Sequence, residues 1–271
     1  MPSATTLAAW SNRGSYVNIE GFDINGQSGS QWKQGILERG SNNIIKNNHI
    51  HHIADKVACD SNGGSAINTS NQDNGVNIDV IGNVVHHMGF AGCNHIHGIY
   101  MATSGNVKNN IVYQVGAVAI HLWHDAAKIN IVNNTVFGST TAILVGGGDF
   151  YKSTTGADYV NVHNNIAFDN SSYGIREYGK LGPNNTYTNN LSYNNGSNWY
   201  LLNGKQHTGD VNADPQFMSY SRTGGGDYRL KATSPAIDKG VKTYAPPADI
   251  NGVVRPQGAG VDIGAYEHTG S

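Results

Sequence analysis

A short motif that returns six times constrains this sequence more than any other feature. Each copy carries one or two Asn, then an apolar residue and a polar turn. The copies are separated by 35, 27, 24, 31 and 25 residues, a period typical of a solenoid whose units bury their apolar sides only by stacking on one another. Aligning the second Asn of each copy gives the column Asn48, Asn83, Asn110, Asn134, Asn165 and Asn190.

A second short segment accompanies each motif and has the period-two alternation of a strand with one buried face. No window shows a sustained helical period, so the strands must form parallel sheets around one axis. Asn tolerates left-handed backbone, and its amide can bond the same residue one coil away. The repeats therefore predict an all-β chain, a right-handed parallel β-helix of about seven coils over residues 15–203. Its inward ladder is expected to contain Ile36, Ile67, Ile99, Ile120, Ile143 and Ile175.

The repeats and the end of the chain resemble the pectate-lyase-like right-handed parallel β-helix superfamily, whose members include secreted bacterial polysaccharide lyases. NADPQF (212–217), SPAIDKG (234–240) and the run 249–268 are similar to the segment that closes many secreted β-helix proteins. The resemblance implies that residues 204–271 cap the last coil within the same domain. We expect residues 1–14 to be an N-terminal cap or a remnant. Its first residues are expected to be an artificial start and not a native signal peptide.

Composition excludes several classes of function. The net charge of −2 and a charged fraction of 13% give no basic field, so no nucleic-acid partner is expected. No apolar run approaches the roughly 20 residues of a membrane span, and we expect a monomer. Cys59 and Cys93 lie in the gaps of consecutive coils. We interpret them as a disulfide formed in an oxidising compartment, hence a secreted protein; two free buried thiols are the alternative.

Long gaps between the repeats predict loops that wall a cleft across coils two to five. These gaps are residues 55–65, 89–97 and 147–158. Loops on a rigid scaffold commonly carry function. We therefore expect substrate contacts from side chains on or beside them, namely Arg39, His95, His97, Trp123, His124, Lys152 and Tyr178.

The outward positions on the Ile strands predict a catalytic row. Adjacent coils lie about 4.8 Å apart, so Asn68, Tyr100 and His121 should stand side by side, with Arg176 two coils further on. These residue types suit β-elimination on a uronic-acid polymer. Asn68 and Arg176 would neutralise the carboxylate while the enolate develops. Neutral His121 would take the C5 proton, and Tyr100 would protonate the leaving oxygen or act as the base.

The resemblance implies a competing mechanism, because β-helix lyases of this kind often use Lys or Arg as the base, sometimes with Ca²⁺ holding the carboxylate. Calcium prefers a dense set of oxygen ligands, whereas Asp60, Asp73 and Asp125 are scattered. We therefore predict no dedicated metal site and leave a Ca²⁺ requirement open. The candidate cationic bases are Lys33, Lys152, Arg176 and Lys180.

Structural roles compete with these assignments. Asn68 could be one more stacked turn Asn, and Tyr100 and Trp123 could support a loop. His51 and His86 are candidate zinc ligands. A structural role is favoured for them, because they fall in the same column of the repeat as other aromatic residues. That aromatic column continues through Tyr113, Phe137, Phe168 and Tyr193.

The sequence as a whole predicts a secreted polysaccharide lyase acting on an acidic polysaccharide such as alginate or pectate. A glycoside hydrolase on the same fold would need two carboxylates about 5–9.5 Å apart. Glu38, Asp125 and Glu177 are the acids near the strand face, and they make no convincing pair. A C5-epimerase, which begins with the same proton abstraction, and a non-catalytic carbohydrate-binding β-helix stay open as alternatives.

Overall fold

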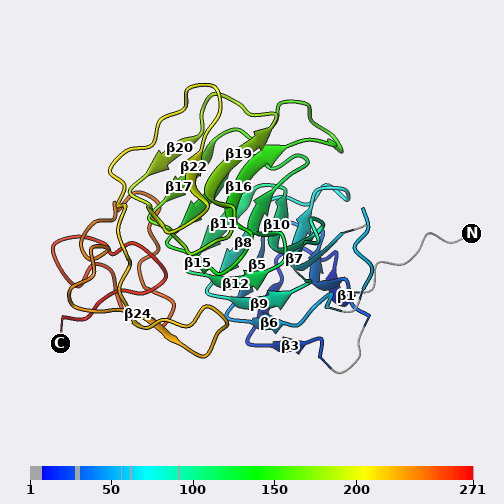
Figure 1. Cartoon of the computed structure of the whole chain (residues 1–271). Coiled ribbons are helices and arrows are strands. Elements are labelled where there is room, and N and C mark those ends of the chain that lie inside the picture. The colour runs from blue at the N-terminus through cyan, green and yellow to red at the C-terminus, as the bar shows by residue number, and fades with distance from the viewer. Residues whose placement is uncertain (1–7, 28–30, 56, 62, 91, 271) are drawn as a thin grey trace, which may run out of the picture.

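Three long parallel sheets wind around one axis and make a right-handed parallel β-helix (Figure 1). The computed structural model describes residues 8–27, 31–55, 57–61, 63–90 and 92–270. Each coil contributes one strand to each sheet, so strands that are neighbours in a sheet are three apart in chain order. The fold predicted from the repeats is confirmed.

The strands are short, as expected for coils of about 25 to 35 residues. The first sheet contains β1 (Ala8–Asn12), β4 (Gln34–Glu38), β7 (Gly64–Ser70), β10 (Ile96–Ala102), β13 (Val118–Leu122), β16 (Thr141–Gly147), β19 (Tyr173–Gly179) and β22 (Ser197–Tyr200). The second contains β2 (Asn18–Glu20), β5 (Asn43–Lys46), β8 (Ile78–Ile81), β11 (Gly105–Lys108), β14 (Ile129–Val132), β17 (Val160–His163) and β20 (Thr186–Thr188). The third contains β3 (Asp23–Asn25), β6 (His49–His51), β9 (Val84–Met88), β12 (Ile111–Val115), β15 (Thr135–Phe137), β18 (Ile166–Phe168) and β21 (Leu191–Tyr193).

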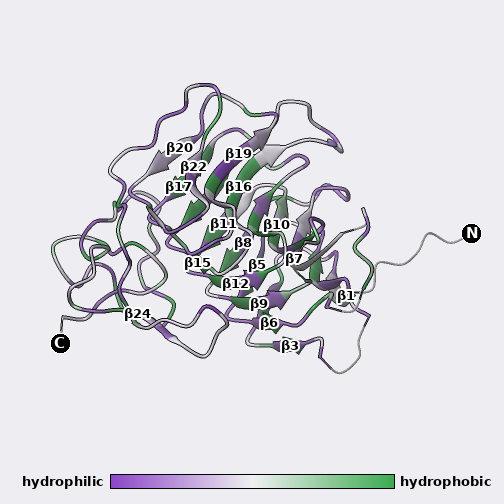
Figure 2. Ribbon diagram, in the orientation of Figure 1, coloured by the Kyte–Doolittle hydropathy of each residue, from purple (hydrophilic) through white to green (hydrophobic). Residues whose placement is uncertain are grey.

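The core is a set of stacked aliphatic side chains inside the coils. Figure 2 shows hydrophobic residues along many of the strands that surround it. In the first sheet the register pairs Ile36 with Ile67, and Ile99 lies opposite both Ile67 and Ile120. The same ladder continues through Ile143 to Ile175. All six Ile side chains are fully buried, and each contributes about 1.5–3 kcal/mol by leaving water.

The repeated Asn forms a second ladder between the second and third sheets. From Asn83 onwards, the Oδ1 atom of each Asn accepts two hydrogen bonds from the Asn one coil earlier, one from its backbone N–H and one from its side-chain amide. For Asn110 donating to Asn134, both distances are 2.9 Å. The same pair of bonds links every neighbour in the column, and the backbone N–H of Asn190 ends the ladder on Asp210. These buried amides are thereby satisfied, which fixes the register of each coil.

The first sheet begins earlier than the sequence indicates. Strand β1 pairs in parallel with β4, and Trp10 lies opposite Ile36. Residues 8–12, part of the segment expected to be an N-terminal cap or a remnant, therefore form a strand of the first coil. Residues 1–7 of that segment lie outside the described residues. No helix among the described residues is long and apolar enough to cross a membrane.

The C-terminal segment, residues 204–271, begins over the last coil and then runs back along the side of the helix. Thr208 and Val211 form isolated bridges to the last coil. The rest includes an antiparallel pair, β23 (Phe217–Ser219) and β24 (Asp227–Leu230), and packs against the aromatic side chains of the third sheet. The segment thus contacts both the last coil and the side of the third sheet.

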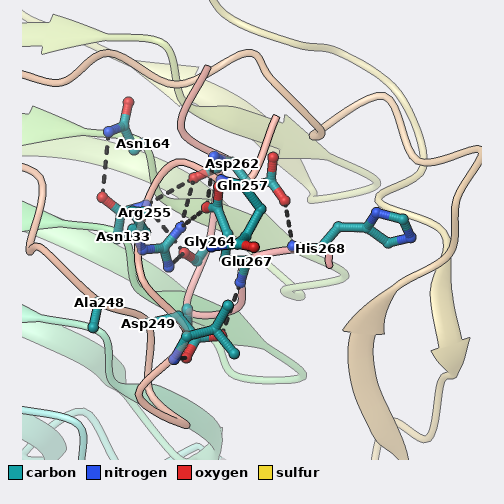
Figure 3. Close-up of polar contacts among 12 residues, drawn as sticks. Asn133, Asn164, Ala248, Asp249, Arg255, Gln257, Asp262, Gly264, Glu267 and His268 are labelled. Atoms are coloured by element: carbon teal, nitrogen blue, oxygen red, sulfur yellow. Dashed lines mark hydrogen bonds and ion pairs between the residues drawn. The ribbon is translucent and has the colours of Figure 1, made fainter. Parts of the chain in front are cut away.

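In the last four motifs the first Asn attaches this segment to the coils, as Figure 3 shows for Asn133. Asn133 donates to the carbonyls of Asp262 and Gly264, and Asn164 exchanges two hydrogen bonds with the backbone of Val241. Both Asn residues have positive φ, 56° and 55°, a conformation that Asn tolerates better than most residues. The two Asn of one motif therefore have different structural roles.

Candidate active site

The predicted catalytic row is present on the outer face of the first sheet. Tyr100 lies opposite both Asn68 and His121 in the strand register. His121 pairs with Leu144, and Leu144 pairs with Arg176. Three side chains of the row are therefore immediate neighbours, and the fourth stands two coils away.

A cavity of about 290 Å³ lies over the Asn68 and Tyr100 end of this row, at strands β4, β7 and β10. Its volume is at the lower end of the range for small-molecule sites, so only a short part of a polymer could enter it. Six of the residues selected from the sequence line it: Arg39, Asn68, His95, His97, Tyr100 and His124.

One wall of the cavity consists of two loops joined by a disulfide. Cys59 and Cys93 are bonded, as predicted, with their Cα atoms 5.6 Å apart. Ser61 and His95, which lie on the loops that carry these cysteines, line the cavity. The disulfide therefore ties together the two gaps that the sequence indicated as cleft walls.

The opposite wall contains Tyr151, which sequence reasoning missed. The carboxylate of Asp125 accepts hydrogen bonds from the backbone N–H groups of Tyr151, Lys152 and Ser153, at 3.1, 3.0 and 2.8 Å. The Tyr151 ring stacks on His124, and its hydroxyl lies 2.8 Å from His124 Nε2. Asp125 thus holds this loop in place and acts structurally. The only signal for Tyr151 was its position in the long gap 147–158.

Two histidines pack against each other at the back of the cavity. His121 Nδ1 lies 3.2 Å from His97 Nε2, and the ring centroids are 4.2 Å apart. His97 lines the cavity, whereas His121 is not among the lining residues. The Nδ1 atom of His97 is buried and has no hydrogen-bond partner among the described residues. Of this pair, His97 is therefore the histidine at the cavity surface. The sequence had suggested it only for substrate contact.

Burial keeps both histidines neutral. Loss of solvation lowers the pKa of His97 to about 3, with a smaller contribution from the charge of His95. Burial also lowers the pKa of His121 well below its usual value, followed by the effects of His97 and His124. Both rings are neutral imidazoles near pH 7. When Nε2–H of His97 donates to Nδ1 of His121, the lone pair on Nδ1 of His97 stays free to accept a proton.

Tyr100 is protonated in this setting. Burial, followed by the nearby Tyr151 and Asp149, raises the pKa of its phenol far above the ordinary value. Its ring centroid lies 5.3 Å from that of His97 and 5.0 Å from that of His121. The phenol can therefore donate a proton, and it could act as a base only by first passing its own proton to another group.

Arg39 is the cation of the cavity. Its Nη1 lies 3.8 Å from the carboxylate of Asp73, and its Nε is buried without a hydrogen-bond partner among the described residues. Gln34, Gln72, Ser65 and Ser70 also line the cavity, and sequence reasoning singled out neither Gln. The described lining contains no carboxylate.

Four other candidates lie outside the cavity lining. The Arg176 guanidinium lies 4.7–5.7 Å from the centroids of three tyrosine rings, including Tyr178. Trp123 stacks on Tyr178 and donates to Asp149, and it covers glycines where a Cβ would collide with its ring. Lys152 reaches Asn74 on the outer surface. Arg176, Tyr178 and Trp123 form a surface beyond the cavity, along the same sheet, and Lys152 lies apart from them.

Two of the cationic base candidates are also placed away from the cavity. Lys33 forms an ion pair with Asp60 at 2.9 Å. Lys180 is exposed after strand β19. Neither is among the residues that line the cavity.

No family model matches the chain, and no curated protein matches it. Among solved structures, the chain is similar to one described as the crystal structure of pectate lyase Pel9A. The two are 17% identical, the TM-score is 0.45, and the match covers 93% of this chain and 69% of the other.

Proposed function

We propose that this protein is a polysaccharide lyase that cleaves an acidic polysaccharide by β-elimination. The observation that carries this proposal is the lining of the cavity. It combines one guanidinium, side-chain amides, a protonated tyrosine and a neutral histidine, with no carboxylate among the described lining residues. Such a lining favours an anionic sugar and supplies both an acceptor and a donor of protons.

The uronate carboxylate would bind to Arg39 and Asn68. Both line the cavity, and neutralising the carboxylate makes the C5 proton more acidic and stabilises the developing enolate. This assigns to Arg39 the role that the sequence gave to Arg176. Gln34 and Gln72 would bind hydroxyl groups of the sugar.

His97 would take the C5 proton, with His121 behind it fixing the ring. The electron pair of the broken C5–H bond becomes the C4=C5 double bond, and the C4–O bond breaks. Tyr100 then donates its proton to the departing oxygen. To complete the cycle, His97 releases its proton to water and the Tyr100 phenolate takes one from water. A neutral His and a neutral Tyr are the forms that this direction of transfer requires.

The alternative of a glycoside hydrolase lacks its carboxylates here. Glu38 and Glu177 are fully buried inside the coils, where Glu38 binds Asn12 and Asn43 and Glu177 binds Tyr187. The carboxylate of Asp125 is occupied by the loop that it holds. None of the three is in the lining of the cavity.

The disulfide supports secretion. Disulfides persist in oxidising compartments and are rare in the cytosol, and the Cys59–Cys93 bond lies beside the cavity. We therefore propose that the protein acts outside the cytoplasm, where polysaccharide substrates occur.

The test is the ultraviolet absorbance of the 4,5-unsaturated sugar while the protein is offered alginate, pectate and glucuronan, with and without chelator. Rising absorbance on one polymer is the expected result and names the substrate; loss of the signal with chelator adds Ca²⁺. Exchange of the C5 proton with deuterated water in the absence of cleavage would instead identify an epimerase. No absorbance and no exchange on all three polymers contradicts the proposal.

A further inference from the structure

A cluster of five histidines lies on the third sheet, away from the cavity. One member begins β6, and the others are two pairs of consecutive residues, one where β6 ends and one within β9; Asp23 from β3 lies beside them. Its members are His49, His51, His52, His86 and His87. The cavity lies on the first sheet, so the proposed lyase mechanism uses none of these side chains.

The aromatic column predicted from the sequence explains two of the five. His51 stacks on His86 with centroids 4.9 Å apart, His86 stacks on Tyr113 at 4.8 Å, and Tyr113 stacks on Phe137 at 4.9 Å. The C-terminal segment covers the Tyr and Phe end of this column, where Tyr228 contacts both rings. Stacking therefore accounts for His51 and His86 but leaves their neighbours unexplained.

His52 and His87 add a second column of rings beside the first. Their rings stack on each other at 4.7 Å, so two columns of imidazoles run side by side. Across the columns, Nδ1 of His51 lies 2.7 Å from Nδ1 of His52, and Nδ1 of His86 lies 2.6 Å from Nδ1 of His87. One ligand nitrogen each from His51, His52 and His86 lie within 4.8 Å of one another. Three ligand nitrogens thus lie close together, and the Nδ1 atom of His87 is next to one of the three residues, His86.

The other nitrogens of these rings contact neighbouring side chains. Asp23 Oδ1 accepts from Nε2 of His51 at 3.0 Å, which leaves the lone pair of that ring on Nδ1. Nε2 of His86 lies 2.7 Å from Nε2 of His49. Nε2 of His52 contacts the amide of Gln27 at 3.0 Å, a group that can donate or accept by turning over. A carboxylate behind a histidine is the usual way in which a metal-binding imidazole is oriented.

We propose that His51, His52 and His86 bind a divalent transition-metal ion, with Zn²⁺ as the first candidate and His87 as a fourth ligand. Imidazole suits zinc, copper and nickel, and Zn–N bonds of about 2.0–2.1 Å need only a small rotation of these rings. The ion would join two consecutive coils at the end of the column that the C-terminal segment leaves uncovered. No free thiol among the described residues competes for it.

The test is a calorimetric titration of the full chain, without a histidine tag and freed of metal by chelator, with Zn²⁺. We expect one ion per chain and a melting temperature that rises with Zn²⁺ and falls back with EDTA, because an ion that binds only the folded state stabilises it. Co²⁺ serves as a second probe, since its visible absorption reports nitrogen ligation. Absence of saturable one-to-one binding overturns the proposal.

The variant His52→Asn/His87→Asn separates metal binding from folding. Both positions have positive φ, 55° and 52°, and Asn194 occupies the equivalent position of a later coil with φ 55°. We expect this variant to melt like the parent in EDTA and to lose at least about tenfold in Zn²⁺ affinity, with Asp23→Asn also weakening binding by about 10- to 100-fold. His268→Asn, at the far end of the chain, is the matched control and should bind normally. Unchanged affinity in the double variant overturns the proposal.

Discussion

The ring of Tyr100 packs in the site, and its hydroxyl group is the proposed proton donor. In Tyr100→Phe the ring still packs against His97 and His121, but no proton can pass to the leaving oxygen. We expect kcat on the responding polymer to fall by about 10²- to 10⁴-fold, with an unchanged melting temperature. Tyr193→Phe, on the third sheet, is the matched control. Turnover of Tyr100→Phe at the parent rate would remove this residue from the mechanism.

Burial of His97 makes stability depend on pH. Its pKa is about 3 in the folded protein and about 6.5 in the unfolded chain. Below pH 6.5 the unfolded chain gains a proton that the folded protein does not, so stability present above pH 6.5 is lost as the pH falls towards 3. The loss reaches about 1.4 kcal/mol per pH unit.

Urea unfolding of the parent and of His97→Gln at pH 7 and pH 5 checks this. We expect the free-energy difference between the two proteins to shrink by up to about 2 kcal/mol at pH 5. His95→Gln, exposed in the folded protein, should follow the parent at both pH values. A constant difference between the parent and His97→Gln would contradict the assignment.

The Asn ladder is the element that sets the register of the coils. Asn134→Ala removes the acceptor of two hydrogen bonds from Asn110 and the donor to the carbonyl of Val107. All of these groups are buried, and each unsatisfied one costs about 1–3 kcal/mol. We expect denaturant unfolding to show a loss of several kcal/mol.

The same coil supplies the control. Asn130→Ala lies on strand β14 in a partly exposed ladder with Asn106 and Asn161. Water replaces its partners, so we expect a loss of less than about 1 kcal/mol. Equal effects of the two substitutions would show that burial of the ladder does not matter.

For the strands and ladders, the sequence correctly predicted the features that repeat from coil to coil. The column of Ile and the column of Asn recur with a recognisable pattern, so the register that places Asn68, Tyr100 and His121 side by side followed from counting. The loops do not repeat. Tyr151 reaches the cavity because Asp125 holds its loop, a contact that no periodicity predicts.

At the scale of the whole molecule, one buried ion pair stabilises the C-terminal segment. Arg255 Nη1 lies 2.6 Å from Glu267 Oε2, and both side chains are almost completely buried (Figure 3). Arg255→Ala leaves an uncompensated buried carboxylate, so we expect a loss of about 3–5 kcal/mol in the free energy of unfolding. Arg229→Ala, which breaks an exposed ion pair with Asp227, should have no measurable effect.

A double substitution sharpens the test. Arg255→Met/Glu267→Leu removes both charges, and we expect it to recover much of the stability that Arg255→Ala loses. A double variant less stable than Arg255→Ala would show that the hydrogen bonds that Glu267 accepts from the backbone N–H groups of Gln257 and Asp262 matter more than relief of its unpaired charge.

The sequence by itself determined the β-helix, its register and the outward side chains that stand side by side, because each coil repeats the same local contacts. Tertiary structure alone decided which of these residues reach the cavity. It placed Arg39 and His97 there and left Arg176 among tyrosines. It also gave the first Asn of the motif its role in holding the C-terminal segment. These outcomes depend on non-repeating contacts between distant segments, and such contacts leave no period in the sequence.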